Sequence, residues 1–270
     1  MTDTPFPRFA PDHDPGPSFL GLLRRVAPHD VVGAGTSQTA PPMELLHGTT
    51  VLALRYAGGV VMAGDRRATA GYSIANRRME KIYPADEHSG VAIAGVAGPA
   101  VEMVRLFQVQ LEHYEKIEGE PLSLEGKANQ LAQLVRTNLP AAMQGFVVVP
   151  VFAGFDERRD RGRVFSFDVT GGKYEEIDFQ AGGSGGVHAR NWIKSVWHEN
   201  LTEDEGIDLA LRALFSAADE DAATGGPDLI RGIFPSVAVI EAVGFRPVSD
   251  DETAARTQRL VGGREEGAGL

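Results

Sequence analysis

The stretch that decides the fold runs from Gly48 to Asp65 and reads GTTVLALRYAGGVVMAGD. Its two apolar runs, Thr49–Tyr56 and Val60–Asp65, flank the pair Gly58-Gly59. Apolar, β-branched runs on either side of a short glycine turn predict a β-hairpin. If Gly58-Gly59 forms a two-residue turn, the register places Asp65 opposite Leu52, within a few residues of Thr49.

The sequence before this hairpin has a different character. Residues 1–48 contain eight of the 16 prolines of the chain, and proline is excluded from helix interiors and from sheet ladders. We therefore expect residues 1–48 to be a largely disordered pro-segment, with at most a short amphipathic turn around Phe19–Val26. The alternative is a terminal tail without a purpose, which is common.

The abrupt change at Thr49 is the layout expected if the chain is cut between Gly48 and Thr49. A hydroxyl is a weak nucleophile at neutral pH, and it is activated by a neighbouring base. A threonine freed at a chain terminus carries both groups, because its own α-amine can serve as the base. Thr49 is therefore the candidate nucleophile, and Gly48-Thr49 is the candidate cleavage site.

The rest of the chain alternates pairs of strands with pairs of helices. After the hairpin we expect strands at Tyr72–Ala75 and Val91–Gly95. An apolar helix face that begins at Val101 should end near Gly119, and Ser123 should cap a second helix. The second half repeats this scheme, and its expected strands are 146–155, 163–168, 174–180 and 235–242, with helices at 187–197 and 207–218.

This order predicts an α+β fold. Strands joined by hairpins favour antiparallel sheets, and the apolar faces of the helices must cover them. The simplest arrangement is a four-layer αββα sandwich of two stacked sheets with helices on both outer faces. We expect this domain to span residues 49–248, followed by a loose polar tail at 249–270.

Composition limits the class of protein. The 270 residues are 43% hydrophobic and 23% charged, which suits one ordinary domain with a sizeable core. The net charge of −11 argues against a nucleic-acid partner. No apolar run approaches the ~20 residues of a membrane span, and Ser18–Leu23 precedes rather than follows its arginines, unlike a signal peptide. We expect a cytoplasmic protein; the lack of cysteine excludes a thiol nucleophile and is compatible with that compartment.

Two charged residues and one glycine-containing turn are candidates for helping Thr49. Lys81 lies in a β-like stretch, and Asp65 could orient it. A lysine beside the hydroxyl would lower the pKa of that hydroxyl and help to relay its proton. Acyl transfer also needs donors for the developing oxyanion, which the backbone of Ala94–Gly98 could supply. Taken alone, each charge is more often a solvated surface residue, and the turn is more often a plain strand-to-helix connection.

Together these residues resemble a catalytic β-subunit of the 20S proteasome, of the actinobacterial type. The resemblance covers roughly Gly48 to Val243. Its motifs are Gly48-Thr49-Thr50-Val-Leu-Ala-Leu, Ala63-Gly-Asp65-Arg-Arg-Ala-Thr69, Lys81-Ile82, Ala94-Gly95-Val-Ala-Gly98, Gly183-Ser184-Gly185 and Asp221-Ala-Ala-Thr224-Gly-Gly226. Each is weak alone, but together, in this order and spacing, they are specific.

The resemblance implies an N-terminal-nucleophile hydrolase in which Thr49 attacks and its freed amine is the general base. It implies that Lys81 tunes the hydroxyl, Asp65 holds Lys81, and the Gly95 N–H forms the oxyanion hole. Positions that support the amine and a water correspond to Ser184, Asp221 and Thr224; the family usually has serine where Thr224 stands.

The resemblance also implies how substrates and partners are bound. Thr69 matches the position whose backbone pairs with the substrate as an added strand, and the pocket positions are all apolar: Ala68, Met79, Ile93 and Ala97. We expect cleavage after apolar residues, without a metal or cofactor. The implied assembly is a barrel of two inner β rings and two outer α rings, fed by a ring ATPase with unfolded proteins, often tagged with a small ubiquitin-like protein.

Several alternatives differ from this in class. Gly182–Gly186 satisfies the G-x-S-x-G pattern of serine esterases. Such an enzyme needs an acid and then a histidine further along the chain, whereas the later histidines here, His188 and His198, lie on the helix expected immediately after the serine. A parallel sheet before the serine is not expected either. A flexible glycine loop is the simpler interpretation. A bacterial two-component threonine peptidase related to the proteasome and a catalytically silent ring subunit also stay open. No phosphate-binding GxxxxGK[ST] or zinc-binding HExxH sequence occurs.

Overall fold

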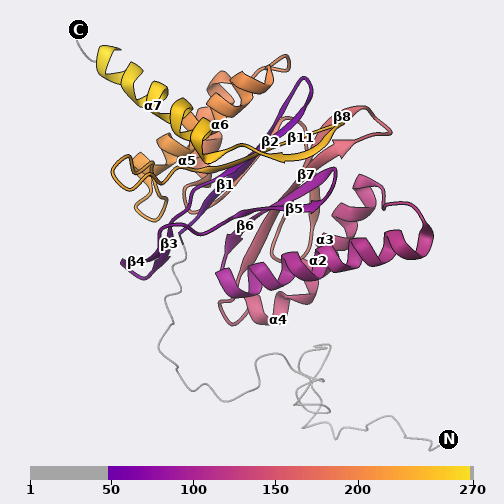
Figure 1. Cartoon of the computed structure of the whole chain (residues 1–270). Helices are drawn as coiled ribbons and strands as arrows, with labels where there is room; N and C mark the ends of the chain where they lie inside the picture. Colours follow the sequence, from indigo (N-terminus) through magenta and orange to yellow (C-terminus); the bar gives the residue numbers. More distant parts are fainter. Residues whose placement is uncertain (1–47, 268–270) are drawn as a thin grey trace, which may run out of the picture. The chain divides into compact units, whose positions relative to one another are not determined.

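The computed structural model describes residues 48–267, with side chains up to residue 260. Apart from Gly48, the predicted pro-segment lies outside the described residues. Two five-stranded antiparallel sheets are stacked on each other and covered by helices on both outer faces (Figure 1). The predicted four-layer αββα sandwich is therefore confirmed.

The first sheet has the strand order β10-β1-β2-β11-β12, and the second has the order β5-β6-β7-β8-β9. A separate hairpin is formed by β3 (Ala68–Ala70) and β4 (Ser73–Asn76). The strands of the first sheet are β1 (Thr50–Tyr56), β2 (Gly59–Gly64), β10 (Phe179–Gly183), β11 (Ser236–Glu241) and β12 (Gly244–Pro247). Those of the second are β5 (Ile82–Asp86), β6 (Ser89–Gly95), β7 (Val148–Asp156), β8 (Arg161–Phe167) and β9 (Lys173–Glu176).

The helices form the two outer layers. The bounds are α2 (Ala97–Glu118), α3 (Leu124–Thr137), α4 (Leu139–Ala142), α5 (Gly186–Val196), α6 (Glu203–Glu220) and α7 (Asp250–Gly267). Helices α5 and α6 pack on the first sheet, and α2 and α3 pack on the second. Within residues 48–267, no helix is long and apolar enough to cross a membrane.

Strand β1 is apolar from Val51 to Leu54 because both of its faces are buried there. Leu52 and Leu54 pack with the core beneath α5 and α6, whereas Val51 and Ala53 face the second sheet. Successive side chains of a strand point to opposite faces, so a central strand in a four-layer fold needs apolar residues at every position. This explains why the stretch after Thr49 shows no polar alternation.

The predicted helix signals are confirmed at the ends of α2 and α3. Gly119 follows α2 in the left-handed conformation, with φ of 76°, which glycine adopts without strain. The Ser123 hydroxyl caps α3 by accepting a hydrogen bond from the Gly126 N–H at 3.1 Å. Helix α6 begins with a further cap, in which Thr202 and Glu205 bond reciprocally.

The register of the first hairpin differs from the prediction by two residues. Tyr56 pairs with Gly59, so the turn is Ala57-Gly58. Gly59 belongs to β2 because a Cβ there would lie 2.1 Å from the Ile240 carbonyl oxygen of β11. Asp65 consequently lies opposite Thr50 rather than Leu52, and its N–H donates to the Thr50 carbonyl at 3.0 Å. A shift by an even number keeps every side chain on its face and brings Asp65 closer to Thr49.

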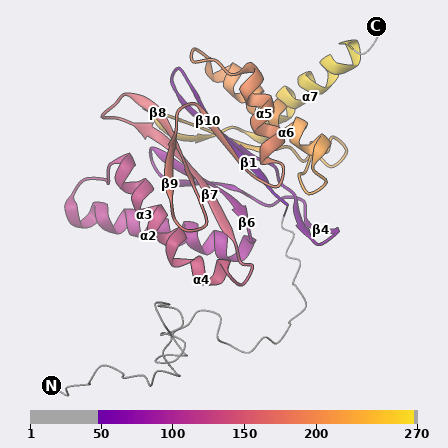
Figure 2. The same ribbon diagram turned by 180° about the vertical axis from the view of Figure 1, so that it is seen from behind.

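Two further expectations were wrong. The single strand predicted at 174–180 is two strands, β9 in the second sheet and β10 in the first, so the chain crosses between the sheets (Figure 2). The stretch expected to be a loose tail forms the helix α7. Its anchor is largely ionic, since buried Arg256 pairs with Asp204 and Asp208 of α6, although Leu260 also packs on the core. A hydrophobic pattern therefore did not reveal the helix.

Candidate active site

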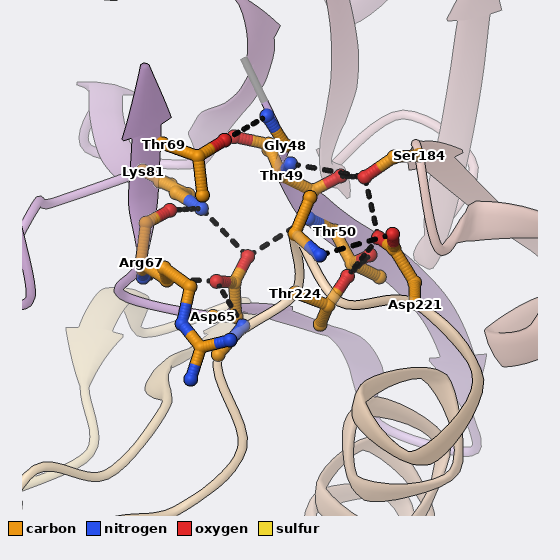
Figure 3. A network of polar contacts seen from close by, with 12 residues as sticks. Gly48, Thr49, Thr50, Asp65, Arg67, Thr69, Lys81, Ser184, Asp221 and Thr224 are labelled. Atoms are coloured by element: carbon orange, nitrogen blue, oxygen red, sulfur yellow. Dashed lines mark hydrogen bonds and ion pairs between the residues drawn. The ribbon is translucent and has the colours of Figure 1, made fainter. Parts of the chain in front are cut away.

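Thr49 lies immediately before β1 and is buried. Its N–H donates to the Ser184 Oγ at 3.2 Å, and its carbonyl accepts from the Ser184 N–H at 2.8 Å (Figure 3). Ser184 follows β10, the neighbour of β1 in the first sheet. Gly183 permits this approach, because it has φ of 90° and a Cβ there would lie 1.8 Å from the Thr49 carbonyl oxygen. Gly183 is thus required by close packing against Thr49, which corrects the interpretation of a flexible loop.

The geometry also excludes the esterase alternative for Ser184. In an esterase elbow the strand before the serine belongs to a parallel sheet, whereas β10 pairs antiparallel with β1. The Ser184 hydroxyl donates to the Asp221 Oδ2 at 2.5 Å. Although Ser184 is exposed at the turn after β10, its hydroxyl is committed to Asp221, so it supports Thr49 and is not a free nucleophile.

Lys81 and Asp65 form a fully buried ion pair, with both side chains 0% exposed. The Lys81 Nζ donates to the Asp65 Oδ1 at 2.6 Å and to the Arg67 carbonyl at 2.6 Å. The Asp65 carboxylate also accepts three backbone N–H groups, from Thr50 at 2.8 Å, Arg67 at 2.9 Å and Gly225 at 2.8 Å. A buried charge is tolerated only with such compensation, and these bonds fix the carboxylate in place.

The pair also joins the two sheets. Asp65 follows β2 of the first sheet, whereas Lys81 precedes β5 of the second and accepts the Ile93 N–H at its carbonyl, at 3.0 Å. Burial lowers the pKa of Lys81, and the attraction of Asp65 opposes that effect without cancelling it. A lysine with a lowered pKa exchanges protons more readily near neutral pH, which suits a proton relay.

A second polar group surrounds Asp221, just beyond α6. Its Oδ2 accepts the hydroxyls of Ser184 and Thr224, at 2.5 and 2.6 Å, and its Oδ1 accepts the Ala223 N–H at 3.1 Å. Burial alone would raise the pKa of Asp221, but these hydrogen bonds outweigh it and the pKa is lowered. The carboxylate is therefore ionised at neutral pH, and it can only accept hydrogen bonds.

Thr50 connects the two groups. Its N–H donates to the Asp65 Oδ1, and its Oγ1 lies 2.6 Å from the Thr224 Oγ1. Because the Thr224 proton is committed to Asp221, Thr50 must be the donor in the bond between the two hydroxyls. Through Thr50, the Lys81–Asp65 pair and the Asp221 group form one continuous network on both sides of Thr49 (Figure 3).

Sequence reasoning missed Thr50 as a part of the site. It shares the strand face of Leu52 and Leu54, both of which are buried, and a hydroxyl on a buried face needs a partner. That rule alone could have marked it. Arg67 was missed as well, and its guanidinium donates to the Ala222 carbonyl at 2.9 Å, next to Asp221.

Gly48 is buried on the other side of the predicted cleavage point. Its N–H donates to the Thr69 Oγ1 of β3 at 2.9 Å. A Cβ at this position would lie 1.7 Å from the Ala223 Cβ, so only glycine fits. The peptide bond between Gly48 and Thr49 is thus held on both sides, by Thr69 and by Ser184.

Gly95 ends β6 and is not a member of this hydrogen-bonded network in the described part of the chain. It has φ of 119°, and a Cβ there would lie 2.1 Å from the Val147 carbonyl oxygen, so glycine is required. Its link to the network runs through Ile93, two residues earlier, which bonds to the Lys81 backbone. Among the other predicted pocket residues, Ile93 is in the core, whereas the half-buried ones are Ala68, Met79 and Ala97.

Comparisons with known proteins agree on one family. Residues 45–230 match the model of the family described as proteasome subunit. A protein named proteasome subunit beta from Acidimicrobium ferrooxidans is 58% identical over 265 residues, covering 97% of this chain and 96% of the relative. Proteins of the same name from Acidothermus cellulolyticus and Streptomyces griseus are 52% and 51% identical, covering 94% and 90% of this chain and 90% and 87% of the relatives.

Proposed function

The chain belongs to the proteasome subunit family as a β-subunit, and we propose that it is a threonine endopeptidase made as a self-cleaving precursor. The observation that carries this proposal is the single buried network around Thr49. This network places the Lys81–Asp65 ion pair on one side of Thr49. On the other side it places the ionised Asp221, which accepts two hydroxyl groups. A silent subunit would have no use for a fully buried lysine and aspartate, since hydrophobic residues are often at least as stabilising there.

The first chemical step is the cut between Gly48 and Thr49. The Thr49 Oγ1 attacks the Gly48 carbonyl carbon, and the C–N bond breaks as the nitrogen takes up the hydroxyl proton. The resulting ester is hydrolysed by water, which leaves a carboxylate on Gly48 and a free α-amine on Thr49. Lys81 favours the attack by electrostatic stabilisation of the oxygen that loses its proton.

The second step is peptide hydrolysis by the freed threonine. The amine takes the hydroxyl proton and the Thr49 Oγ1 attacks the substrate carbonyl. The scissile C–N bond breaks as its nitrogen receives that proton and leaves as an amine, and water then hydrolyses the ester to a carboxylate and the free Thr49 hydroxyl. Ser184 already accepts the Thr49 N–H in the uncut chain, and Asp221 holds that serine. We propose that the Gly95 N–H stabilises the oxyanion, a role that the positive φ of Gly95 permits without a side chain in the way.

The substrates we propose are unfolded polypeptides bound as an added strand at Thr69. The apolar character of Ala68, Met79, Ile93 and Ala97 favours cleavage after apolar residues. Fluorogenic peptides that end in apolar, basic or acidic residues test this preference. Faster cleavage after basic residues would contradict it.

The assembly we propose is a barrel in which two β rings of this chain lie between two α rings, in the cytoplasm. A ring ATPase would feed it unfolded proteins, including proteins tagged with a ubiquitin-like modifier. Enclosure explains the self-cleaving precursor, because an active site exposed before assembly would degrade other proteins.

The deciding experiment is to co-express the chain with its cognate α-subunit and to measure the intact mass of the assembled β-subunit. Loss of residues 1–48 in the wild type, but not in Thr49→Ala, is the expected result. If the wild type assembles and keeps those residues, the protease proposal fails, and a structural ring subunit becomes the better account.

A further inference from the structure

A small cavity lies between α5, α6, α7 and the loops around Pro227 and Pro235. Its volume is about 40 Å³. Apolar side chains form most of its wall: Leu211, Leu214, Phe215, Pro227, Pro235 and Leu260. The three helices that enclose it form one outer layer of the fold (Figure 1).

Three polar side chains line the cavity, and all three are donors. The Trp192 Nε1 and the Thr257 Oγ1 are buried without a hydrogen-bond partner in the part of the chain that the structure describes. Thr257 is only 5% exposed. Arg212, which also lines the cavity, forms no ion pair with a described residue. None of the ten described residues that line the cavity is acidic, although the chain as a whole has a net charge of −11.

We propose that this cavity binds a carboxylate carried on a short apolar stem. An indole N–H can only donate, so the ligand must accept a hydrogen bond. Leaving such buried donors unpaired is costly, and Arg212 supplies the positive charge that a buried carboxylate needs. The volume suits a group of about three heavy atoms, since a cavity needs about 10–15 Å³ to hold one water. The apolar rim then receives the stem.

The cavity shares walls with the candidate active site. Gly225 lines it, and the Gly225 N–H donates to the Asp65 Oδ2 at 2.8 Å. Helix α5, which carries Trp192, begins two residues after Ser184. Occupancy should therefore change the rate of peptide hydrolysis. This consequence rests on the proposed function, whereas binding itself does not.

The same chemistry has two sources, a free aliphatic acid or the terminal carboxylate of a polypeptide. We commit to the shared group and distinguish the sources by the probes. Hexanoate and hexanamide form one matched pair. A tripeptide, acetyl-Gly-Gly-Leu, with either a free carboxylate or a terminal amide, forms the other.

Binding is measured by calorimetry on the purified full chain, with Thr49→Ala used for the peptides so that none is consumed. We expect saturable binding of hexanoate, with hexanamide at least about tenfold weaker because it lacks the charge. Thr257→Val and Trp192→Phe should each weaken hexanoate about fivefold, the effect of one hydrogen bond. Arg212→Gln should remove the preference for the acid over the amide.

Arg259→Gln is the matched control, because Arg259 is an exposed arginine of the same region that does not line the cavity. It should bind hexanoate like the wild type. Absence of saturable hexanoate binding by the wild type overturns the proposal. So does binding that is unchanged in Arg212→Gln, an exposed position at which folding should not fail.

The peptide pair then identifies the source. Tighter binding of the tripeptide acid than of hexanoate assigns the site to a polypeptide terminus, and the reverse assigns it to a free acid. Addition of the tighter ligand to the assembled, processed protein tests the effect on hydrolysis. Binding without a change in rate removes the coupling and leaves the site, whereas a protein that hydrolyses no peptide refutes the proposed function alone.

Discussion

We predict that the Thr50 hydroxyl fixes the Lys81–Asp65 pair and the Asp221 group in position relative to each other. A matched pair of substitutions at Thr50 separates the effect of this hydroxyl from that of its methyl group. Thr50→Val removes the hydroxyl and keeps the side-chain shape. Thr50→Ser keeps the hydroxyl and removes the methyl group. Thr50 is 0% exposed, so both changes are felt in the interior.

The two variants should lose similar amounts of stability. Thr50→Val removes one hydrogen bond to Thr224, which costs about 1 kcal/mol net, because the Thr224 hydroxyl still donates to Asp221 and no donor is left unpaired. Thr50→Ser removes one buried methyl group, which also costs about 1 kcal/mol. A difference in function between the two therefore cannot be assigned to stability.

The two variants should differ in their rates of self-cleavage and peptide hydrolysis. In Thr50→Val a methyl group replaces an oxygen that lies 2.6 Å from the Thr224 Oγ1. That distance is too short for carbon and oxygen without a hydrogen bond, so Thr224 must shift, and Asp221, which still accepts its hydroxyl, shifts with it. We expect self-cleavage and peptide hydrolysis to slow about tenfold, which corresponds to about 1.4 kcal/mol, while Thr50→Ser stays within about twofold of the wild type.

The assay is co-expression with the α-subunit, followed by intact mass at timed intervals, peptide hydrolysis and thermal unfolding of each assembled variant. The hydrolysis should be measured across pH, since a disturbed Asp221 group would also shift the pH profile. The reasoning is refuted if Thr50→Ser loses as much activity as Thr50→Val, or if Thr50→Val is processed at the wild-type rate.

The remaining predictions concern the cleavage point and the two carboxylates. Gly48→Ala should slow self-cleavage more than about tenfold, because its methyl group would lie 1.7 Å from the Ala223 Cβ; intact mass measures this, and adding Ala223→Gly should restore processing if the clash is the cause. Lys81→Met should cost about 3–5 kcal/mol in chemical unfolding, since it leaves the charge of Asp65 buried and unpaired; adding Asp65→Asn should recover much of that stability but no processing, and a double variant as unstable as the single one would contradict this account. Folding lowers the pKa of Asp221 below its ordinary value of 3.8, so the ionised carboxylate stabilises the fold above about pH 3.8, and this contribution is lost as pH falls through the folded pKa. Asp221→Asn should therefore flatten the acid side of the curve of melting temperature against pH. An unchanged slope below about pH 4 would show that the carboxylate is not held as described.

Local signals were sufficient for most elements of this fold, and their failures have identifiable physical causes. The cap of Ser123 and the stop at Gly119 depend on residues next to each other in the chain, so they were predicted correctly. The predicted hairpin register was wrong because Gly59 is a glycine for a reason other than the turn: a side chain there would clash with the backbone of β11. That strand lies almost two hundred residues further along the chain, and no local rule can place it beside Gly59. The apolar pattern also did not reveal that the chain crosses between the sheets at 177–178. Both β9 and β10 are half-exposed strands, so neither has a run of apolar residues that would mark its ends.

The site shows the same division. Thr49, Asp65, Lys81, Ser184, Asp221 and Thr224 were all expected near one another, and the structure brings all six into one network. Pattern alone marked the first three, and the family resemblance was needed for the others. Thr50 and Arg67 were missed because each acts through a partner distant in sequence, Thr224 and Ala222, respectively.

The network explains how one site can serve both proposed reactions. In the uncut chain the nitrogen of Thr49 is an amide, and its N–H already donates to the Ser184 Oγ. Scission converts that nitrogen into an amine without any need to move it, because Ser184 is held by Asp221 and by its own backbone bond to Thr49. On the proposed function, the contacts that hold the Thr49 nitrogen are therefore in place before the cut, and the base is what the cut adds. Since an amide nitrogen is not a base until its C–N bond breaks, the attack in the proposed cut relies on Lys81, whereas every later turnover would have the α-amine at the same position.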